Sequence, residues 1–377
     1  IRGDGNSRPL LLMAHSDVVS VEPERWDHDP FGGEVIDGQV WGRGAVDTKD
    51  LVACELMVML LVQRSGLRLD GDLIMATFAD EETSGDYGAS WMWRNRREMI
   101  DADVAINEGG GVALDVGWRR VYLCQTGEKG TTRMRVTAPG EPGHASVPLP
   151  NTAMHHAGRA LTTLTDHTFP TVLTQTVERM LRALAAAAGG KMERAITIAL
   201  QDRSWEQLSR IPLPEAELRT LYATTRNTAV PTLIHGGHPV NGIPSEDTIA
   251  VDGGVLPGQD PEAFTADVQA LLADDARVEL TEQEMGLEAD PDSALFRAIG
   301  DAMATLDPGA TVVPYLSSGG TDAKCLPGVR VYGFMPMRDH LEEADLAHAH
   351  NERVSVSTLE LGTRALYEIV TRYCHAR

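Results

Sequence analysis

Three short apolar runs, each followed at once by polar residues, constrain the fold of this chain more than any other feature. Residues 9–14, 71–79 and 103–107 have the length and the apolar character of buried strands. A largely apolar helical pattern over residues 49–63 lies between the first two runs. Strands that alternate with helices indicate an α/β domain with a mainly parallel sheet.

The polar residues after each run fall at the carboxyl ends of the predicted strands, where such folds place their sites. The residues concerned are His15 and Asp17 after the first run, Glu81 and Glu82 after the second, and Glu108 after the third. Asp47 follows two glycines, Gly42 and Gly44, that let the backbone pass close to a site. The third glycine of a dinucleotide-binding fingerprint is missing there, because Asp47 stands in its place.

Five candidate metal ligands stand at or near the ends of predicted elements: His15, Asp47, Glu82, Glu108 and His348. Two imidazoles and three carboxylates suit zinc, cobalt or manganese, and are too rich in nitrogen for calcium. One carboxylate can bridge two ions about 3.5–4 Å apart. Asp17, two residues after His15, can hold the second ring nitrogen of that histidine. Taken singly, each of these residues is as typical of a polar surface loop.

The neighbours Glu81 and Glu82 suggest two different roles for the carboxylates at the end of the second strand. If Glu82 binds metal, Glu81 can face a bound water and accept its proton. An acidic turn is the alternative for this pair. Either His348 or His350 can be the ligand, because both stand in one His-x-His segment. His144 by itself indicates a surface or core histidine.

The sequence pattern changes near residue 127. Alternation over residues 131–137 is typical of a half-exposed antiparallel strand. Further expected elements are helices at 152–164, 177–188 and 261–273 and a strand at 248–256. We therefore expect a smaller α+β domain, residues 127–283, inserted between the two parts of the larger domain, residues 1–126 and 284–377.

The formal charge of −22 argues against nucleic acid and against an anionic membrane surface as partners. No stretch is long and apolar enough to cross a bilayer. Four cysteines without a C-x-x-C pair predict a reduced, cytoplasmic protein. Because the chain does not begin with Met, we expect its true N-terminus, and any signal peptide there, to be missing.

Taken together, these segments resemble the metallopeptidase family of aminoacylase, succinyl-diaminopimelate desuccinylase and glutamate carboxypeptidase (peptidase family M-twenty). The matching segments, in family order, are H-S-D-V-V at 15–19, W-G-R-G-A-V-D-T-K at 41–49, A-D-E-E-T-S-G at 79–85, I-N-E-G-G-G at 106–111, G-H-A-S at 143–146, G-G-T-D-A at 319–323 and H-A-H-N-E-R-V at 348–354. Each segment is weak alone, but the ordered set is specific and spans nearly the whole chain.

The resemblance implies a site with two divalent ions, zinc first and cobalt or manganese as alternatives. The implied ligands are His15 and Glu108 for one ion, Glu82 and His348 for the other, and Asp47 as the bridge. Glu81 would be the general base for a metal-bound hydroxide that attacks the amide carbonyl, and Asp17 would orient His15. The family's ligand histidine stands four residues before a glutamate, here Glu352, which favours His348 over His350.

In the family, the inserted domain usually pairs two subunits. The resemblance therefore implies a homodimer in which His144 reaches the partner's active site and polarises the scissile carbonyl. Asn241 matches an asparagine that contacts substrate, and Gly319 and Gly320 match a loop that lines the pocket. The implied activity is hydrolysis of amide or peptide bonds in small substrates, as in a carboxypeptidase, dipeptidase or aminoacylase.

One departure concerns the grip on the substrate. Thirteen residues after Asn241, many members carry an arginine that holds the substrate carboxylate, and here Gly254 stands in its place. Gly254 therefore leaves two alternatives to the implied hydrolase: a deacylase with an atypical substrate, and a homologue that binds metal and peptide with impaired catalysis. A serine hydrolase is not supported, because the sequence has no G-x-S-x-G.

Overall fold

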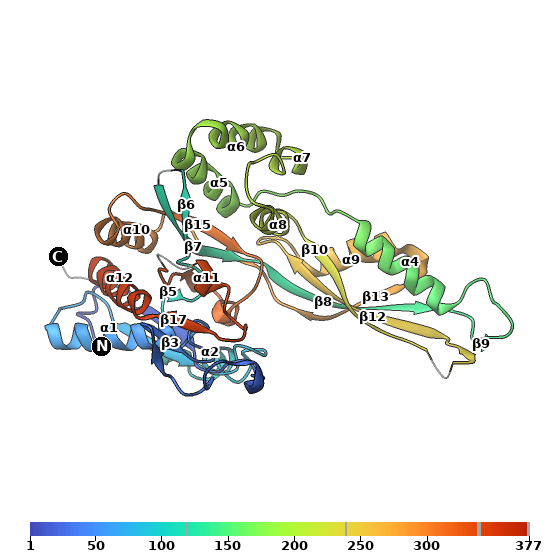
Figure 1. The fold of residues 1–377 in the computed structure, drawn as a ribbon, viewed down its shortest axis with the longest axis horizontal. Helices are drawn as coiled ribbons and strands as arrows, with labels where there is room; N and C mark the ends of the chain where they lie inside the picture. The colour runs from blue at the N-terminus through green and yellow to red at the C-terminus, as the bar shows by residue number, and fades with distance from the viewer. Residues whose placement is uncertain (118, 238–239, 338–340, 375–377) are drawn as a thin grey trace.

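Two main sheets, each with its own helices, form the body of the structure (Figure 1), and the short strands form two smaller sheets, β11-β9 and β17-β3-β2. The computed structural model describes residues 1–117, 119–237, 240–337 and 341–374. The large sheet has eight strands, most of them in parallel pairs, and the second sheet has four antiparallel strands. The prediction of a mainly parallel α/β domain with a smaller α+β domain inserted in it is confirmed.

The large sheet has a continuous row of six strands with two more strands attached. Its strands are β1 (Leu10–His15), β4 (Leu73–Phe78), β5 (Val104–Asn107), β6 (Ala113–Val116), β7 (Arg119–Glu128), β14 (Leu287–Glu288), β15 (Thr311–Ser317) and β16 (Arg330–Gly333). The order is β14-β7-β16-β5-β1-β4, and β15 and β6 pair with β7. β4, β1, β5 and β16 are parallel, so their carboxyl ends meet at one edge.

Strand β1 explains why the apolar runs are continuous. Leu10, Leu12 and Ala14 pack into the core on one face of the sheet, and Leu11 and Met13 into the core on the other. Helices α1 (Lys49–Ser65), α10 (Ala294–Leu306) and α12 (Val356–Cys374) contribute to the first core. Helices α2 (Ala89–Asn95) and α3 (Arg97–Ile100) contribute to the second. Because both faces are covered, residues 10–14 of the strand are all apolar, and only its last residue, His15, is polar.

The small sheet has the order β10-β12-β8-β13 and projects away from the large one (Figure 1). Its strands and helices are β8 (Gly130–Pro139), β10 (Thr228–His235), β12 (Glu246–Val255), β13 (Arg277–Gln283), α4 (Ala153–Asp166) and α9 (Pro261–Leu272). β8 alternates between buried and exposed residues, because the two helices cover only one of its faces. The predicted strands and helices of this region are confirmed.

Three helices that the sequence did not predict follow α5 (Gln175–Ala188). They are α6 (Gly190–Asp202), α7 (Trp205–Leu208) and α8 (Glu215–Thr224). α5 contacts the large sheet, where Ala187 packs against Val121 and Val313. Part of the segment 127–283 therefore covers the large sheet, and the three domain boundaries stay a prediction.

The remaining elements are short. They are η1 (Pro23–Arg25), β2 (Val35–Ile36), β3 (Gln39–Trp41), β9 (Gly143–His144), β11 (Gly242–Ile243), η2 (Ala273–Asp275), η3 (Asp322–Cys325), α11 (Leu341–Ala344) and β17 (Arg353–Ser355). Within the described part of the chain, no helix combines the length and the hydropathy that a membrane span requires.

Helix α1 carries a buried carboxyl group that should lower stability. Glu55 is 0% exposed, and neither carboxyl oxygen has a hydrogen-bond partner among the described residues. Burial raises the pKa of Glu55 well above its usual value, and the charge of Asp50 adds to the shift. The folded chain therefore holds a proton that the unfolded chain loses above about pH 4.5, so the free energy of unfolding falls as pH rises.

We expect Glu55→Leu to raise the free energy of unfolding by about 1–3 kcal/mol, because it removes a buried polar group without partners. The gain should be larger at pH 8 than at pH 5. Denaturant unfolding at both pH values measures it, with Glu55→Gln as the control that stays polar. A loss of stability in Glu55→Leu would contradict the expectation.

Candidate active site

The carboxyl ends of three neighbouring strands bring four of the predicted side chains together. His15 is the last residue of β1 and stands in register with Phe78, the last residue of β4. Glu81 and Glu82 lie in the turn after β4, and Glu108 directly follows β5. Parallel pairing therefore places these side chains at one edge of the sheet, as the sequence predicted.

Asp47 lies between the two predicted ligand histidines. Its Oδ1 is 3.0 Å from Nε2 of His15, and its Oδ2 is 3.1 Å from Nε2 of His348. Each imidazole also has a carboxylate of its own. Glu108 Oε2 lies 3.5 Å from His15 Nε2, and Glu82 Oε2 lies 2.8 Å from His348 Nε2. The five side chains thus form two groups, one with His15 and Glu108 and one with His348 and Glu82, and Asp47 lies between them.

The donor atoms of this cluster suit divalent metal ions. Two groups of three have their ligand atoms within 4.8 Å of one another, and these are His15 with Asp47 and Glu82, and His15 with Glu81 and Glu108. Oε1 of Glu108 is buried and has no hydrogen-bond partner among the residues described. Imidazole nitrogens with carboxylate oxygens match the preference of zinc, cobalt and manganese. Glu81 joins the cluster on its His15 side.

The charges of the cluster shift the pKa of two groups strongly in the metal-free chain. Burial raises the pKa of Glu81 to about 9, and the negative charge of Glu108 adds to this effect. Burial disfavours the charged form of His15, but the hydrogen bonds to Asp47 and Glu108 outweigh it and raise the pKa of His15 to about 12. Both groups therefore hold protons that positive ions would displace.

A buried glutamate, Glu352, supports the loop of Asp47. Glu352 is 0% exposed and accepts hydrogen bonds from the backbone nitrogens of Gly44, Val46 and Asp47, at 2.8–3.1 Å. Its Oε2 also accepts from Arg43 Nη1 at 2.5 Å. The Asp47–Thr48 peptide bond in this loop is cis. The H-x-x-x-E spacing was the available signal for this role.

Asp17 contacts His15 and Glu82, whereas Nδ1 of His350 makes no hydrogen bond within the described chain. The backbone oxygen of Asp17 lies 3.1 Å from His15 Nδ1, closer than its Oδ1 at 3.5 Å. Oδ2 of Asp17 accepts the backbone N–H of Glu82. His350 is half-buried, and its Nδ1 has no hydrogen-bond partner in the described chain. His348 adopts a left-handed backbone conformation with φ of 62°, a strain that is typical of functional positions.

The loop after β15 lies next to the cluster. Gly319 and Gly320 lead into η3, whose Asp322 is 4% exposed. Thr321 of this loop accepts a hydrogen bond from Asn107, the neighbour of Glu108. Burial raises the pKa of Asp322 to about 7, and the charge of Glu108 contributes. Asp322 belongs to the matching segment G-G-T-D-A, but no role for it was predicted from the sequence.

The comparison with known families agrees with this geometry. The model described as peptidase family M20/M25/M40 matches residues 11–372, nearly the whole chain. The chain belongs to this family. It is a metallopeptidase or amidohydrolase of the carboxypeptidase and aminoacylase type, so the predicted enzyme class is confirmed.

Individual relatives of this family member are distant but match along most of its length. The N-fatty-acyl-amino acid synthase/hydrolase PM20D1 of Xenopus tropicalis is 28% identical over 95% of this chain and 71% of its own. Aminoacylase-1B of Rattus norvegicus is 25% identical over 92% of this chain and 75% of its own. The metallo-carboxypeptidase Sso-CP2 of Sulfolobus solfataricus shares the fold, with a TM-score of 0.72 at 17% identity over 98% of this chain and 86% of its own.

Lys129 fills the space beside Gly254, the position at which the family resemblance implies an arginine in many members. A Cβ atom at Gly254 would lie only 2.8 Å from Nζ of Lys129 and from Oγ1 of Thr228. Nζ donates hydrogen bonds of 3.0 Å to the backbone oxygens of Ala223 and Arg226 and to Thr228 Oγ1. Burial lowers the pKa of Lys129 to about 7, and the like charge of Arg226 adds to this. Its three donors are engaged, so Lys129 does not replace the arginine.

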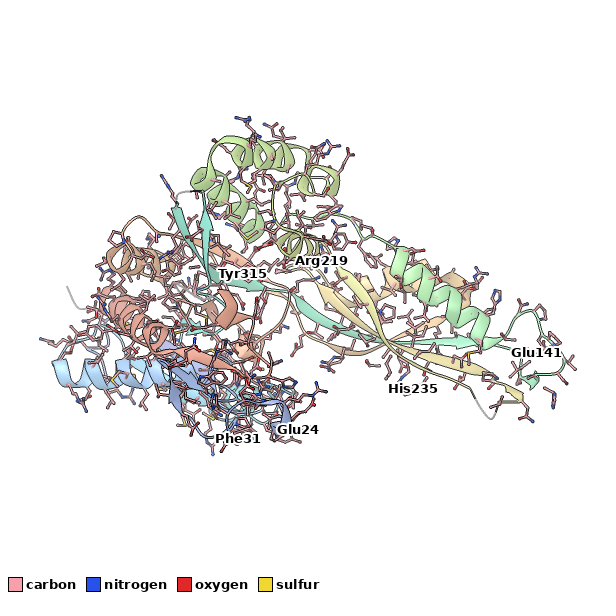
Figure 2. The ribbon with its side chains drawn as sticks, in the orientation of Figure 1. Glu24, Phe31, Glu141, Arg219, His235 and Tyr315 are labelled. Atoms are coloured by element: carbon pink, nitrogen blue, oxygen red, sulfur yellow. The ribbon has the colours of Figure 1, made fainter. Side chains whose placement is uncertain are left out.

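His144 and Asn241 lie together but apart from the other predicted site residues. β9 and β11 pair His144 with Gly242, and the backbone oxygen of Asn241 accepts the N–H of Ala145. β9 stands at the far tip of the small domain (Figure 1). Figure 2 shows Glu141, just before β9, at this tip and Glu24 on the large domain. One chain therefore does not bring His144 to the metal cluster.

Proposed function

We propose that the chain hydrolyses amide or peptide bonds in small substrates with two divalent ions, and that Glu81 is the general base. The observation that carries the proposal is Asp47, whose two oxygens lie 3.0 and 3.1 Å from two different imidazoles. A carboxylate in this position can bridge two ions. His15 and Glu108 would hold one ion, and Glu82 and His348 the other.

The chain's own residues supply the proton transfers. When bound, two divalent ions lower the pKa of water and polarise a carbonyl group. Glu81 Oε2 lies 4.0 Å from His15 Nε2, beside the position of the first ion. Glu81 takes a proton from the attacking water and delivers it to the leaving amine. Burial and the charge of Glu108 raise the pKa of Glu81 to about 9 without ions, and the positive charge of two bound ions would lower it, so that Glu81 is ionised and can accept the proton.

For the substrate, we propose N-acyl amino acids first and dipeptides second. The names of the two relatives, an N-fatty-acyl-amino acid synthase/hydrolase and an aminoacylase, support the first class. The complete cluster with Glu81 argues against a catalytically impaired homologue. Release of amine from a panel of acyl-amino acids and dipeptides tests the proposal. If none of these substrates is hydrolysed, the proposal is wrong.

The surroundings of Gly254 lead to a prediction about specificity. Because Lys129 has its three donors engaged, no cation at this position grips a substrate carboxylate. We expect an N-acyl amino acid and its carboxamide to differ in kcat/KM by less than about tenfold. A loss of several hundredfold with the carboxamide would show that a different cation provides the grip.

We further propose that the protein is a homodimer through the small domain. β10 is an edge strand of the small sheet, and three of its apolar side chains are about half exposed: Val230, Leu233 and Ile234. A second copy would cover this edge and would bring a partner's His144 to the metal cluster. The cytoplasmic location stays a prediction.

Mixing two inactive variants tests the shared site. In a dimer of Glu81→Gln and His144→Ala chains, one of the two sites has both an intact Glu81 and an intact partner histidine. Mixing equal amounts should restore about a quarter of wild-type kcat, because about half of the dimers are mixed. If His144 acts within its own chain, or not at all across subunits, the mixture stays as inactive as its components.

A further inference from the structure

A series of buried hydrogen bonds joins the end of β7 to the loop after β15 and to the end of β5. Glu128, the last residue of β7, is 1% exposed. Its Oε2 accepts hydrogen bonds from Gln125 Nε2 at 3.0 Å and from Thr321 Oγ1 at 3.1 Å. Thr321 Oγ1 in turn accepts from Asn107 Nδ2 at 3.1 Å. One carboxylate oxygen therefore links three segments of the large domain that are far apart in the sequence.

This network holds both neighbours of the proposed ligand Glu108. Asn107 directly precedes Glu108 and donates to Thr321. Gly109 directly follows it and lies against Gln125, since a Cβ atom at Gly109 would be 2.3 Å from Gln125 Oε1. The backbone of Glu108 is thus held from both sides by residues that converge on Glu128.

The same network reaches the loop that the family resemblance assigns to the substrate pocket. Thr321 directly follows Gly320, and its Oγ1 also accepts the backbone N–H of Ala323. Glu128 Oε2 therefore fixes the start of η3 as well as the end of β5. A displacement of this loop would be transmitted to Glu108 through a single hydroxyl group.

Placing a carboxyl group at this position is unfavourable for stability. Burial raises the pKa of Glu128 to about 7, which the positive charge of Lys324 partly offsets. Its Oε1 has no hydrogen-bond partner in the part of the chain that the structure describes. A buried polar group that is only half satisfied is costly compared with an apolar side chain of similar size. A stabilising role alone therefore does not account for Glu128.

We propose that Glu128 is a positioning residue for the metal centre, which acts through Thr321, Asn107 and Gln125 to hold Glu108 in place for the ion at His15. The inference rests on the proposed function, because it assumes that Glu108 is a metal ligand. Residues that orient metal ligands commonly change metal affinity by tenfold or more when they are replaced. The ion at Glu82 and His348 lies in the other half of the cluster and should be affected less.

The test is a titration of metal-free protein with Zn²⁺ in competition with a chromogenic chelator, so that it does not depend on activity. For the wild type, we expect two ions to bind. Glu128→Leu removes the hydrogen-bond acceptor. For this variant we expect one ion to bind with wild-type affinity, and the affinity for the other ion to fall at least about tenfold. Glu128→Gln should bind both ions almost normally, because its amide oxygen can still accept from Gln125 and Thr321.

A second pair of variants and a control on the same strand make the test independent of folding defects. Thr321→Val should lower the affinity for the same ion as Glu128→Leu does, and Thr321→Ser should have the wild-type affinity. Thr126 is 1% exposed and bonds to Thr176 at 3.2 Å. Thr126→Val also loses a buried hydroxyl, so it should lower the melting temperature without changing the affinity for either ion.

Each result has a defined meaning. A wild-type chain that binds fewer than two ions overturns the proposed metal centre, and this inference with it. If the wild type binds two ions and both Glu128→Leu and Thr321→Val bind them as tightly as Thr126→Val does, the positioning role is wrong and the metal centre stands. If Glu128→Leu does not fold, the comparison of Thr321→Val with Thr321→Ser decides.

Discussion

Replacing Glu81 by glutamine is expected to reduce kcat by about 10²–10⁴-fold while both metal ions stay bound. The two side chains have nearly the same shape, but glutamine does not accept a proton at neutral pH. Glu81 is not one of the proposed ligands, and His15, Asp47 and Glu108 remain in the variant to hold the first ion. Steady-state kinetics together with metal analysis of the purified variant measures both quantities.

A matched control separates the loss of the base from a general loss of charge. Glu24 is exposed in η1 and has no part in the cluster, so Glu24→Gln should keep wild-type kcat. If Glu81→Gln retains more than about a tenth of wild-type kcat, a different group transfers the proton. If the variant loses an ion, Glu81 serves as a metal ligand. Its position allows this role, because a carboxylate oxygen of Glu81 lies within 4.8 Å of ligand atoms of His15 and Glu108.

Removing the metal ions is expected to abolish turnover, and adding zinc, cobalt or manganese should restore it. Without the ions, His15 holds a proton, since the pKa of this group is raised to about 12, and Glu81 holds another, with a pKa of about 9. A metal needs the neutral imidazole, so binding must release protons. Metal affinity should therefore rise as pH increases from 6 to 9.

Calorimetry in buffers of different ionisation enthalpy counts the protons released for each ion. The release of protons should be largest for the ion at His15, because the carboxylates on that side raise the pKa of His15. Binding without proton release, or an affinity that falls with rising pH, would contradict the assigned ligands. Full activity in a chain freed of metal would contradict the proposed function itself.

Local sequence patterns were enough to predict the larger part of the fold. β1, β4 and β5 lie within or one residue from the three apolar runs, because strands covered on both faces need apolar residues at every position. The helices α6 to α8 were not predicted. Their buried residues pack in one cluster with Leu181 of α5 and with Leu316 of β15, which is distant in the sequence.

The sequence by itself determined that His15, Glu81, Glu82 and Glu108 meet at one edge, since the polar residues after buried strands must emerge where parallel strands end. Only the tertiary structure decided that Asp47 lies between His15 and His348, that Glu352 holds its loop and that Lys129 fills the space at Gly254. It also placed His144 at the far tip of the small domain. The physical reason is that these contacts join residues up to 305 positions apart, and they depend on how whole elements pack and not on any local periodicity.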